Sequence, residues 1–289
     1  MRWRARVGYG FSSPVVAQGL VCVTDSQLDK PKALERILCF EEATGNPLWA
    51  YSHEVTYPEW AFTTGQEKGP NATPILHDGK VYVLGSLGHL FCLEARKGKV
   101  LWKKDLAKEY GFDPLQTTSA SPLIEGNLLI LLIPGKPCVL ALEKNSGKEI
   151  WRALDESAAH SSPILIHAGG VQQMVVWSQQ SVSGLDPGTG KVHWQEKLPT
   201  LSDSIIATPV YSNGRLLLSG LMLKLGEDKP AAAVLWPAAR SPVRRILSNT
   251  STPLLREDCV YSAKSSGELI CLEAATGKML WETNSVTDL

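Results

Sequence analysis

The chain contains six cysteines, and their spacing shows whether a zinc site or a redox motif is present. Thiolates bind zinc, and two of them in Cys-x-x-Cys exchange disulfides. The cysteines are Cys22, Cys39, Cys92, Cys138, Cys259 and Cys271, with no two adjacent and no Cys-x-x-Cys pair. The spacing therefore predicts no metal site and no redox motif, and it favours small buried thiols in apolar strands. A disulfide between neighbouring strands stays open for Cys22–Cys39 and for Cys259–Cys271.

Histidines and acidic residues do not form a catalytic pattern either. The six histidines are scattered along the chain, and neither Gly-x-Ser-x-Gly nor His-Glu-x-x-His occurs. Asp25 and Asp29 lack the Asn/Asp and Gly residues that a calcium-binding loop needs between them. The sequence thus predicts no catalytic residue and favours a protein that is not an enzyme.

Four residues are better suited to binding than to catalysis. Tyr57 and Trp60 lie in the longest segment between strand-like patterns, residues 50–73, and loops commonly present binding groups. Asn71 and His160 each precede a recurrent proline by three residues, a position expected near the mouth of a central channel and held by Phe11 in the first copy. We predict that these four residues contact a ligand or partner. The alternative is that Trp60 packs its loop onto the fold and His160 is merely solvated.

A repeat reveals the elements that position these residues. A segment resembling Leu-Glu-Ala-x-x-Gly-Lys-x-Leu-Trp recurs, and its copies end at Trp49, Trp102, Trp151, Trp194, Trp236 (a degenerate copy) and Trp281. Ser/Thr-Pro pairs recur in step at 13–14, 73–74, 121–122, 162–163, 208–209 and 252–253. Two independent markers in step predict a structural repeat of about 45 residues.

Each repeat has the chemistry of four short strands. In the second copy, apolar runs at 74–77, 80–85, 89–95 and 99–102 are separated by glycine-containing turns such as Asp78-Gly79. Four-stranded meanders at this period are typical of a β-propeller. The repeated tryptophan is expected to be structural, with its ring between neighbouring blades and its N–H hydrogen-bonded.

We therefore predict an all-β fold in which residues 1–289 form a single β-propeller domain of four-stranded antiparallel blades. Six complete blades are expected at about 12–51, 73–105, 121–154, 161–198, 207–236 and 252–282. Trp3 resembles the end of another blade, so we expect the chain to be a fragment of a seven- or eight-bladed ring. In the first blade, residues 25–33 are expected to form an extended loop.

Composition and charge bear on three questions: binding to nucleic acid, a membrane-spanning segment and a signal peptide. Lys+Arg and Asp+Glu are equal at 29 each, which argues against binding to nucleic acid. The longest aliphatic run, 128–133, is much shorter than a membrane-spanning helix of about 20 residues. The charged N-terminal residues are not followed by an apolar segment, so no signal peptide is predicted in this chain.

The repeat motif, together with the Ser/Thr-Pro pairs, resembles the tryptophan-docking repeat of the pyrroloquinoline-quinone (PQQ) family of β-propellers. This family includes quinoprotein dehydrogenases and bacterial outer-membrane assembly scaffolds of the BamB type. The resemblance implies a periplasmic or exported protein. Active quinoproteins hold PQQ against adjacent cysteines and bind calcium with acidic and amide groups, and this sequence lacks the adjacent cysteines.

Two functions remain open from the sequence. The first is a non-catalytic scaffold without a cofactor, which binds a protein or a small ligand on its loop face. The alternative is a PQQ- and calcium-dependent quinoprotein oxidoreductase of the alcohol or sugar dehydrogenase type, in an active or a degenerate form.

Overall fold

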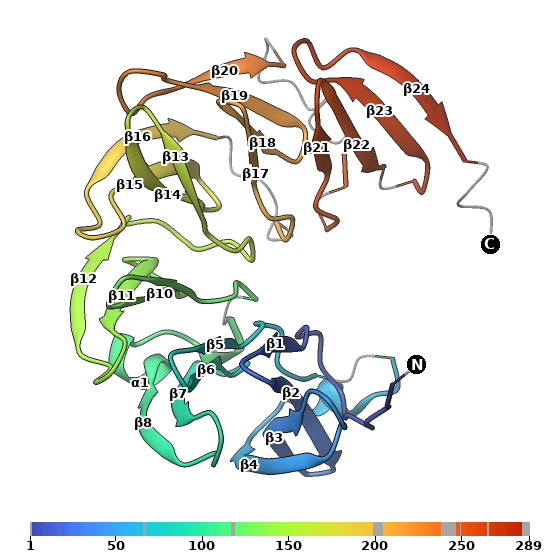
Figure 1. Cartoon of the computed structure of the whole chain (residues 1–289), viewed down its shortest axis with the longest axis vertical. Helices are drawn as coiled ribbons and strands as arrows, with labels where there is room; N and C mark the ends of the chain where they lie inside the picture. Colours follow the sequence, from blue (N-terminus) through green and yellow to red (C-terminus); the bar gives the residue numbers. More distant parts are fainter. Residues whose placement is uncertain are drawn as a thin grey trace. The chain divides into compact units, whose positions relative to one another are not determined.

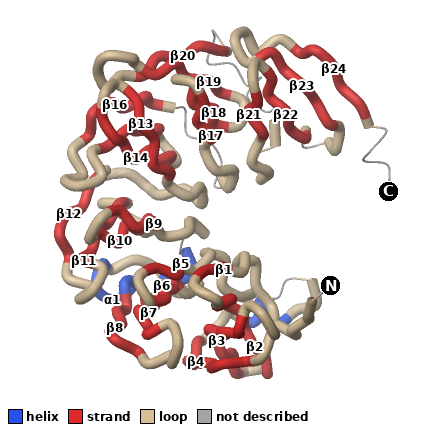
Figure 2. The backbone as a smooth tube through the Cα atoms, viewed as in Figure 1, coloured by secondary structure: helices blue, strands red, loops and turns tan. Residues whose placement is uncertain are grey.

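The computed structural model describes residues 2–65, 68–116, 119–198, 205–237, 247–248, 250–264 and 266–284. Over these residues the strands form six four-stranded antiparallel sheets, and in each sheet the strands follow one another in chain order (Figures 1 and 2). This is the blade architecture of a β-propeller, as predicted. The chain divides into two compact units, residues 1–135 with 139–150 and residues 136–138 with 151–289, which are described separately.

The first unit contains three sheets. The strands of the first sheet are β1 (Val15–Ala17), β2 (Leu20–Asp29), β3 (Lys32–Glu41) and β4 (Pro47–Val55); those of the second are β5 (Ile75–His77), β6 (Lys80–Leu84), β7 (His89–Glu94) and β8 (Val100–Asp105); those of the third are β9 (Leu123–Glu125), β10 (Leu128–Leu132), β11 (Val139–Glu143) and β12 (Glu149–Ala153), the last of which continues into the second unit. The connections carry the short helices η1 (Glu59–Phe62), α1 (Leu106–Tyr110) and η2 (Pro114–Gln116).

The second unit also contains three sheets. Their strands are β13 (Ile164–Ala168), β14 (Val171–Trp177), β15 (Ser181–Leu185) and β16 (Val192–Lys197); β17 (Val210–Ser212), β18 (Arg215–Leu218), β19 (Leu221–Leu225) and β20 (Ala232–Trp236); and β21 (Leu254–Arg256), β22 (Cys259–Ala263), β23 (Leu269–Glu273) and β24 (Met279–Thr283).

The second sheet is buried on both faces, and β6 shows how its sequence allows this. Val81 and Val83 belong to the apolar cluster shared with the first sheet, whereas Tyr82 and Leu84 belong to the cluster shared with the third. Successive side chains of a strand point to opposite faces. A continuous apolar run therefore fills two inter-blade cores at once, which explains why the inner strands are uniformly hydrophobic rather than alternating.

At several positions, the recurrent Ser/Thr-Pro pair links one blade to the next. The amide of Thr73 donates to the hydroxyl of Ser121 at 3.0 Å, and the amide of Thr208 donates to that of Thr252 at 3.1 Å. Because the hydroxyl accepts a hydrogen bond from the equivalent residue of the preceding blade, the residue type is needed once per repeat.

The repeated tryptophan docks onto the next blade. The Trp49 indole N–H donates to the carbonyl of Ala95 at 2.8 Å, in the turn between β7 and β8. The same turn places Gly98 with φ +67°, and a Cβ there would lie 2.5 Å from Trp49 Cδ2. Equivalent indole–carbonyl bonds join Trp3 to Glu42, Trp102 to Lys144 and Trp236 to Ala274. The repeated glycine therefore makes the turn and leaves space for the indole.

Trp194 departs from this pattern because the following repeat is degenerate. The turn between β19 and β20 lacks the Ala-x-x-Gly segment that would receive an indole. The Trp194 N–H instead donates to Gln173 Oε1 at 2.6 Å, within its own sheet. A buried indole N–H needs an acceptor, and here a side chain replaces the missing turn.

The expected loop at 25–33 is wrong. β2 runs to Asp29 and β3 starts at Lys32, so the two strands form a long hairpin instead. Its outer half is fixed by the cross-strand pair Asp25 and Arg36, whose side chains form two hydrogen bonds of 2.8 and 2.6 Å. Within the hairpin, Arg36 thus neutralises the buried Asp25 carboxylate.

Candidate functional site

A cavity of about 440 Å³ opens in the first unit beside the long hairpin. It is lined by Gly8, Tyr9, Gly10, Phe11, Trp60, Gly65, Lys68, Gly69 and Asn71. Two of the four predicted binding residues, Trp60 and Asn71, are in this lining. The cavity lies between the N-terminal segment and the end of the 50–73 connection, and these two segments are far apart in the sequence.

Backbone hydrogen bonds hold the walls of the cavity together. Tyr9 exchanges two amide–carbonyl bonds with Ser26 of β2, at 2.9 and 2.7 Å, and the Phe11 amide donates to the Pro70 carbonyl at 2.9 Å. The Gly8 amide donates to the buried Asp25 carboxylate at 2.5 Å. A Cβ on Gly69 would lie 2.3 Å from the Tyr9 carbonyl oxygen, so glycine is needed for this close approach.

Three aromatic rings around the cavity are exposed. The exposed fraction is 77% for Phe11, 50% for Trp60 and 47% for Tyr9. The Lys68 ammonium lies over the Trp60 ring, 5.7 Å from its centroid. Burial lowers the pKa of Lys68, and this effect is opposed by the nearby Glu35 carboxylate. Aromatic rings beside a cation and the Asn71 amide suit a protein segment with apolar and acidic or polar side chains.

Trp60 does not anchor its loop. Tyr57 and Ala61 are buried in a small apolar cluster with Ala33, Val55 and Leu87, whereas Trp60 lies on the exposed side of η1. The packing role considered for Trp60 is thus filled by its neighbours, and its ring is left on the surface. Tyr57 is inside, and we assign it to positioning the loop rather than to direct contact.

A buried carboxylate organises the interior behind the cavity. Glu35 accepts a 2.6 Å hydrogen bond from the Tyr57 hydroxyl and further bonds from the Ser86 amide and hydroxyl. A Cβ on Gly85 would lie 2.5 Å from Glu35 Oε2. Burial first, and then the Glu35 charge, raise the pKa of Tyr57, so the phenol stays a proton donor. Among the described residues, no Lys or Arg forms an ion pair with Glu35.

His53 lies against the same carboxylate from β4. Its Nε2 is 3.6 Å from Glu35 Oε2, and its ring contacts Phe91 and His89 at centroid distances of 4.7 and 5.1 Å. Neither imidazole nitrogen has a hydrogen-bond partner among the described residues. Burial lowers the pKa of His53, opposed by Glu35 and reinforced by His89 and Lys103.

We expect the stability of the protein to fall in mild acid because of His53. Its folded-state pKa lies below the unfolded-state value of about 6.5, so the unfolded chain binds the proton first as pH falls. The loss begins near the unfolded-state pKa and ends below the folded-state one, with a slope of at most about 1.4 kcal/mol per pH unit. Urea unfolding of wild type and His53→Phe between about pH 5 and 8 measures it.

The variant should lose that part of the acid slope. The exposed His167, replaced by Gln, serves as the control and should keep the wild-type slope. Equal slopes for wild type and His53→Phe would contradict the assignment.

The other two predicted residues have different surroundings. Asn71 Nδ2 donates to the Ser119 hydroxyl at 3.1 Å, and these two residues occupy equivalent positions in consecutive blades. Asn71 is thus held at the cavity wall by the next blade. His160 is half-buried and belongs to the second unit, so it is not part of this cavity.

Two features of the site were not chosen from the sequence. Phe11 occupies the same repeat position as Asn71, but only polar residues at this position were predicted to bind, and Phe11 has the most exposed ring of the cavity. Glu35 lies in a strand where Ala33, Ile37 and Cys39 are buried on one face. Alternation along the strand places Glu35 on that face too. The sequence pattern therefore indicates a buried Glu35, but the prediction of a loop at residues 25–33 left it unnoticed.

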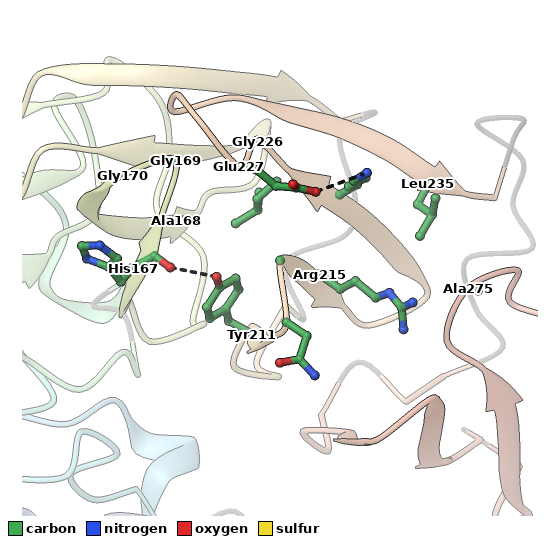
Figure 3. Close-up of a pocket in the computed structure, with 14 residues that line it drawn as sticks. His167, Ala168, Gly169, Gly170, Tyr211, Arg215, Gly226, Glu227, Leu235 and Ala275 are labelled. Atoms are coloured by element: carbon green, nitrogen blue, oxygen red, sulfur yellow. Dashed lines mark hydrogen bonds and ion pairs between the residues drawn. The ribbon is translucent and has the colours of Figure 1, made fainter.

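A second hollow of about 640 Å³ lies in the second unit (Figure 3). It is lined mainly by the turns that follow β13, β17 and β19. Two of its polar side chains are already paired: the Tyr211 hydroxyl donates to the His167 carbonyl at 2.8 Å (Figure 3), and Arg215 donates to Asp258 at 3.0 Å. It contains none of the four predicted residues, and the first cavity is therefore the better candidate.

The described residues do not fit a PQQ site. Five of the cysteines are buried, within inner strands or, for Cys138, directly before β11, and Cys259 is half-buried in β22. No group of three His, Cys, Asp or Glu residues with metal-binding geometry occurs in the described part of the chain. No helix there combines the length and apolarity needed to cross a membrane.

Comparison with known proteins agrees with the fold. Residues 33–283 match the family model described as outer membrane protein assembly factor BamB. BamB of Moranella endobia is 23% identical over 80% of this chain and 63% of its own length. The quinoprotein alcohol dehydrogenase PedH of Pseudomonas putida is 28% identical over 57% of this chain and 29% of its own length. The chain thus spans less than two thirds of both relatives.

A solved structure extends the comparison. The crystal structure of BamB from Moraxella catarrhalis matches with a TM-score of 0.65 and 18% identity, over 94% of this chain and 72% of that one. The likeness of structure shows the shared propeller fold, and the family model covers most of the sequence. The chain therefore belongs to the family of the outer membrane protein assembly factor BamB.

Proposed function

We propose that this chain is a non-catalytic scaffold that binds protein during the assembly of outer-membrane proteins, in the bacterial periplasm. The family match supports the process, because the relatives are named for it. The observation that carries the binding role is the set of exposed rings of Tyr9, Phe11 and Trp60 around one cavity.

The cavity suits a protein segment better than a reacting substrate. Its walls offer aromatic surface, one cation and one amide, and its supporting groups, Asp25 and Glu35, are already hydrogen-bonded within the fold. Exposed aromatic residues close together are typical anchors of protein interfaces. We propose that Phe11 and Trp60 contact the partner, with Asn71 at the rim and Tyr57 positioning the loop.

The test is complementation in the bacterium that encodes the protein. A strain without it should contain less folded outer-membrane β-barrel protein, and the wild-type gene should restore the amount. We expect the double variant Phe11→Ala/Trp60→Ala to restore little, because loss of two anchor side chains weakens binding by about 10-fold or more. The quantity measured is folded porin, separated by heat-modifiable mobility on gels.

The matched control is Val171→Ala/Leu254→Ala, which removes two exposed apolar side chains of the second unit. It should restore porin like wild type. Equal restoration by both double variants, at equal protein levels, would contradict the assignment of the site. No loss of porin in the strain without the protein would contradict the proposed process itself.

The quinoprotein alternative rests on the similarity to PedH. It predicts that PQQ with calcium quenches tryptophan fluorescence saturably and that a chelator reverses the effect. We expect no saturable quenching at tens of micromolar PQQ, because the buried and separated cysteines cannot present a cofactor-binding surface. Stoichiometric, chelator-sensitive quenching would favour the oxidoreductase.

A further inference from the structure

Two cysteines face each other inside the first sheet. Cys22 of β2 and Cys39 of β3 are direct cross-strand partners, and the Cys22 thiol donates to Cys39 Sγ at 3.1 Å. Both side chains are fully buried in the core between the first and second sheets. Directly opposed side chains on antiparallel strands have Cβ atoms about 4.5–5.5 Å apart, close to the separation in a disulfide.

The repeat itself shows that this pairing is particular to the first blade. Cys39, Cys92 and Cys271 occupy the same repeat position. The residue across the strand from Cys92 is Tyr82, and the one across from Cys271 is Tyr261. The first blade alone of these three places a second cysteine at the facing position. The common cysteine is explained by core packing, whereas the facing Cys22 is not.

We propose that Cys22 and Cys39 are a disulfide-forming pair that cross-links β2 to β3. The oxidant is a small disulfide such as oxidised glutathione. One cysteine thiolate attacks it and releases one glutathione, and the other then attacks the mixed disulfide and releases the second. Each cysteine loses one hydrogen, one S–S bond forms, and the two electrons reduce the glutathione disulfide to two thiols.

The cross-link would act on the hairpin that carries the cavity wall. Asp25 and Ser26 of β2 hold Gly8 and Tyr9 through the hydrogen bonds described above. The pair lies on the same two strands, a few residues away from these contacts. The disulfide thus ties together the two strands on which the N-terminal segment rests, and this inference stands whether or not the proposed function is correct.

Burial decides when the reaction takes place. The hydrogen bond to Cys39, followed by burial, raises the pKa of the Cys22 thiol, and both thiols are shielded from an oxidant in the folded protein. Disulfide exchange requires the thiolate and access to the oxidant. The bond therefore forms while the chain folds, and the experiment refolds the full chain in a glutathione redox buffer.

The test counts thiols and maps the cross-link. After refolding with oxidised glutathione, acid quenching and alkylation under denaturing conditions, we expect four of the six cysteines to be labelled. Trypsin cleaves after Arg6, Lys32, Arg36 and Lys68, so the disulfide joins peptides 7–32 and 37–68, each of which contains one cysteine. Reduction before alkylation should restore all six labels.

Two single variants provide controls. Cys39→Ser should leave all five remaining thiols labelled, whereas Cys92→Ser, at the matching repeat position, should still lose two labels and keep the 7–32 to 37–68 cross-link. Six labelled thiols in the oxidised, refolded wild type would overturn the proposal. A cross-link of Cys22 or Cys39 to any other cysteine would overturn it too, as would one between Cys259 and Cys271 alone. Mapping on the wild-type chain decides the matter even where a variant fails to fold.

Discussion

Replacing Trp236 with alanine is expected to lower the free energy of unfolding by about 3–5 kcal/mol. The side chain is only 7% exposed and packs in the core between the second and third sheets of its unit. Its N–H donates to the Ala274 carbonyl at 2.8 Å, and this carbonyl would lose its indole donor. Urea unfolding followed by far-ultraviolet circular dichroism measures the change.

Trp281 is the matched control because it ends the next copy of the same repeat but is 45% exposed. Trp281→Ala should cost about 1 kcal/mol or less, as for a surface substitution. If both tryptophans cost the same, docking onto the next blade is not what makes Trp236 important. Trp236→Phe should lie between, since the ring is kept and the N–H is lost.

The receiving turn offers a reciprocal test of the same contact. A Cβ on Gly277, which has φ +71°, would lie 2.8 Å from Trp236 Cδ2. Gly214 has φ +72°, with nothing within 4 Å of such a Cβ. Gly214→Ala should therefore cost only the backbone strain, about 1–2 kcal/mol, and Gly277→Ala should cost more. Equal losses would show that the indole moves aside freely.

The fold was predictable because its determinants recur. Each blade repeats the proline-opened strand, the glycine turn and the tryptophan, so errors in one copy are corrected by the others. The sequence also predicts the strands of the second sheet within a few residues, from β5 at Ile75 to β8 at Val100. The long hairpin of β2 and β3 was missed because the corresponding strands of the second sheet, β6 and β7, are shorter, so that copy could not correct the expected loop at residues 25–33.

The candidate site was predictable only in part, for the same reason. Trp60 and Asn71 were found from loop length and repeat position, and both line the cavity. Tyr57 was predicted to contact a ligand or partner, whereas its side chain is buried and its hydroxyl donates a hydrogen bond to the Glu35 carboxylate. The contact between the segment at Gly8–Tyr9 and the hairpin joins residues with no local pattern in common, so only the three-dimensional structure reveals that wall.

Glu35 occupies a position where a charge is expensive unless it is fully hydrogen-bonded. Its carboxylate is buried, and the Tyr57 hydroxyl and the Ser86 amide and hydroxyl all donate to it. Tyr57 belongs to the connection carrying Trp60, and Ser86 belongs to the turn after β6. One carboxylate therefore ties the second sheet and the connection at residues 50–73 to β3.

We expect Glu35→Gln to lower the free energy of unfolding by about 2–4 kcal/mol. Glu35 Oε1 accepts from both Tyr57 and Ser86, and a glutamine oxygen in its place would accept the same bonds without the charge, which makes them about half as strong. The glutamine NH2 group also adds a buried donor where Glu35 has an acceptor oxygen. Glu54 is exposed on the neighbouring β4, and Glu54→Gln should change stability by about 0.5 kcal/mol or less.

A double-mutant cycle of Glu35→Gln with Tyr57→Phe measures the contribution of the hydrogen bond between these two side chains. A coupling of about 1 kcal/mol or more supports that bond, and additive losses would show that the two side chains act independently. Because the same network holds the loop, Glu35→Gln should also reduce partner binding even where Trp60 is intact, whereas Glu54→Gln should leave it unchanged.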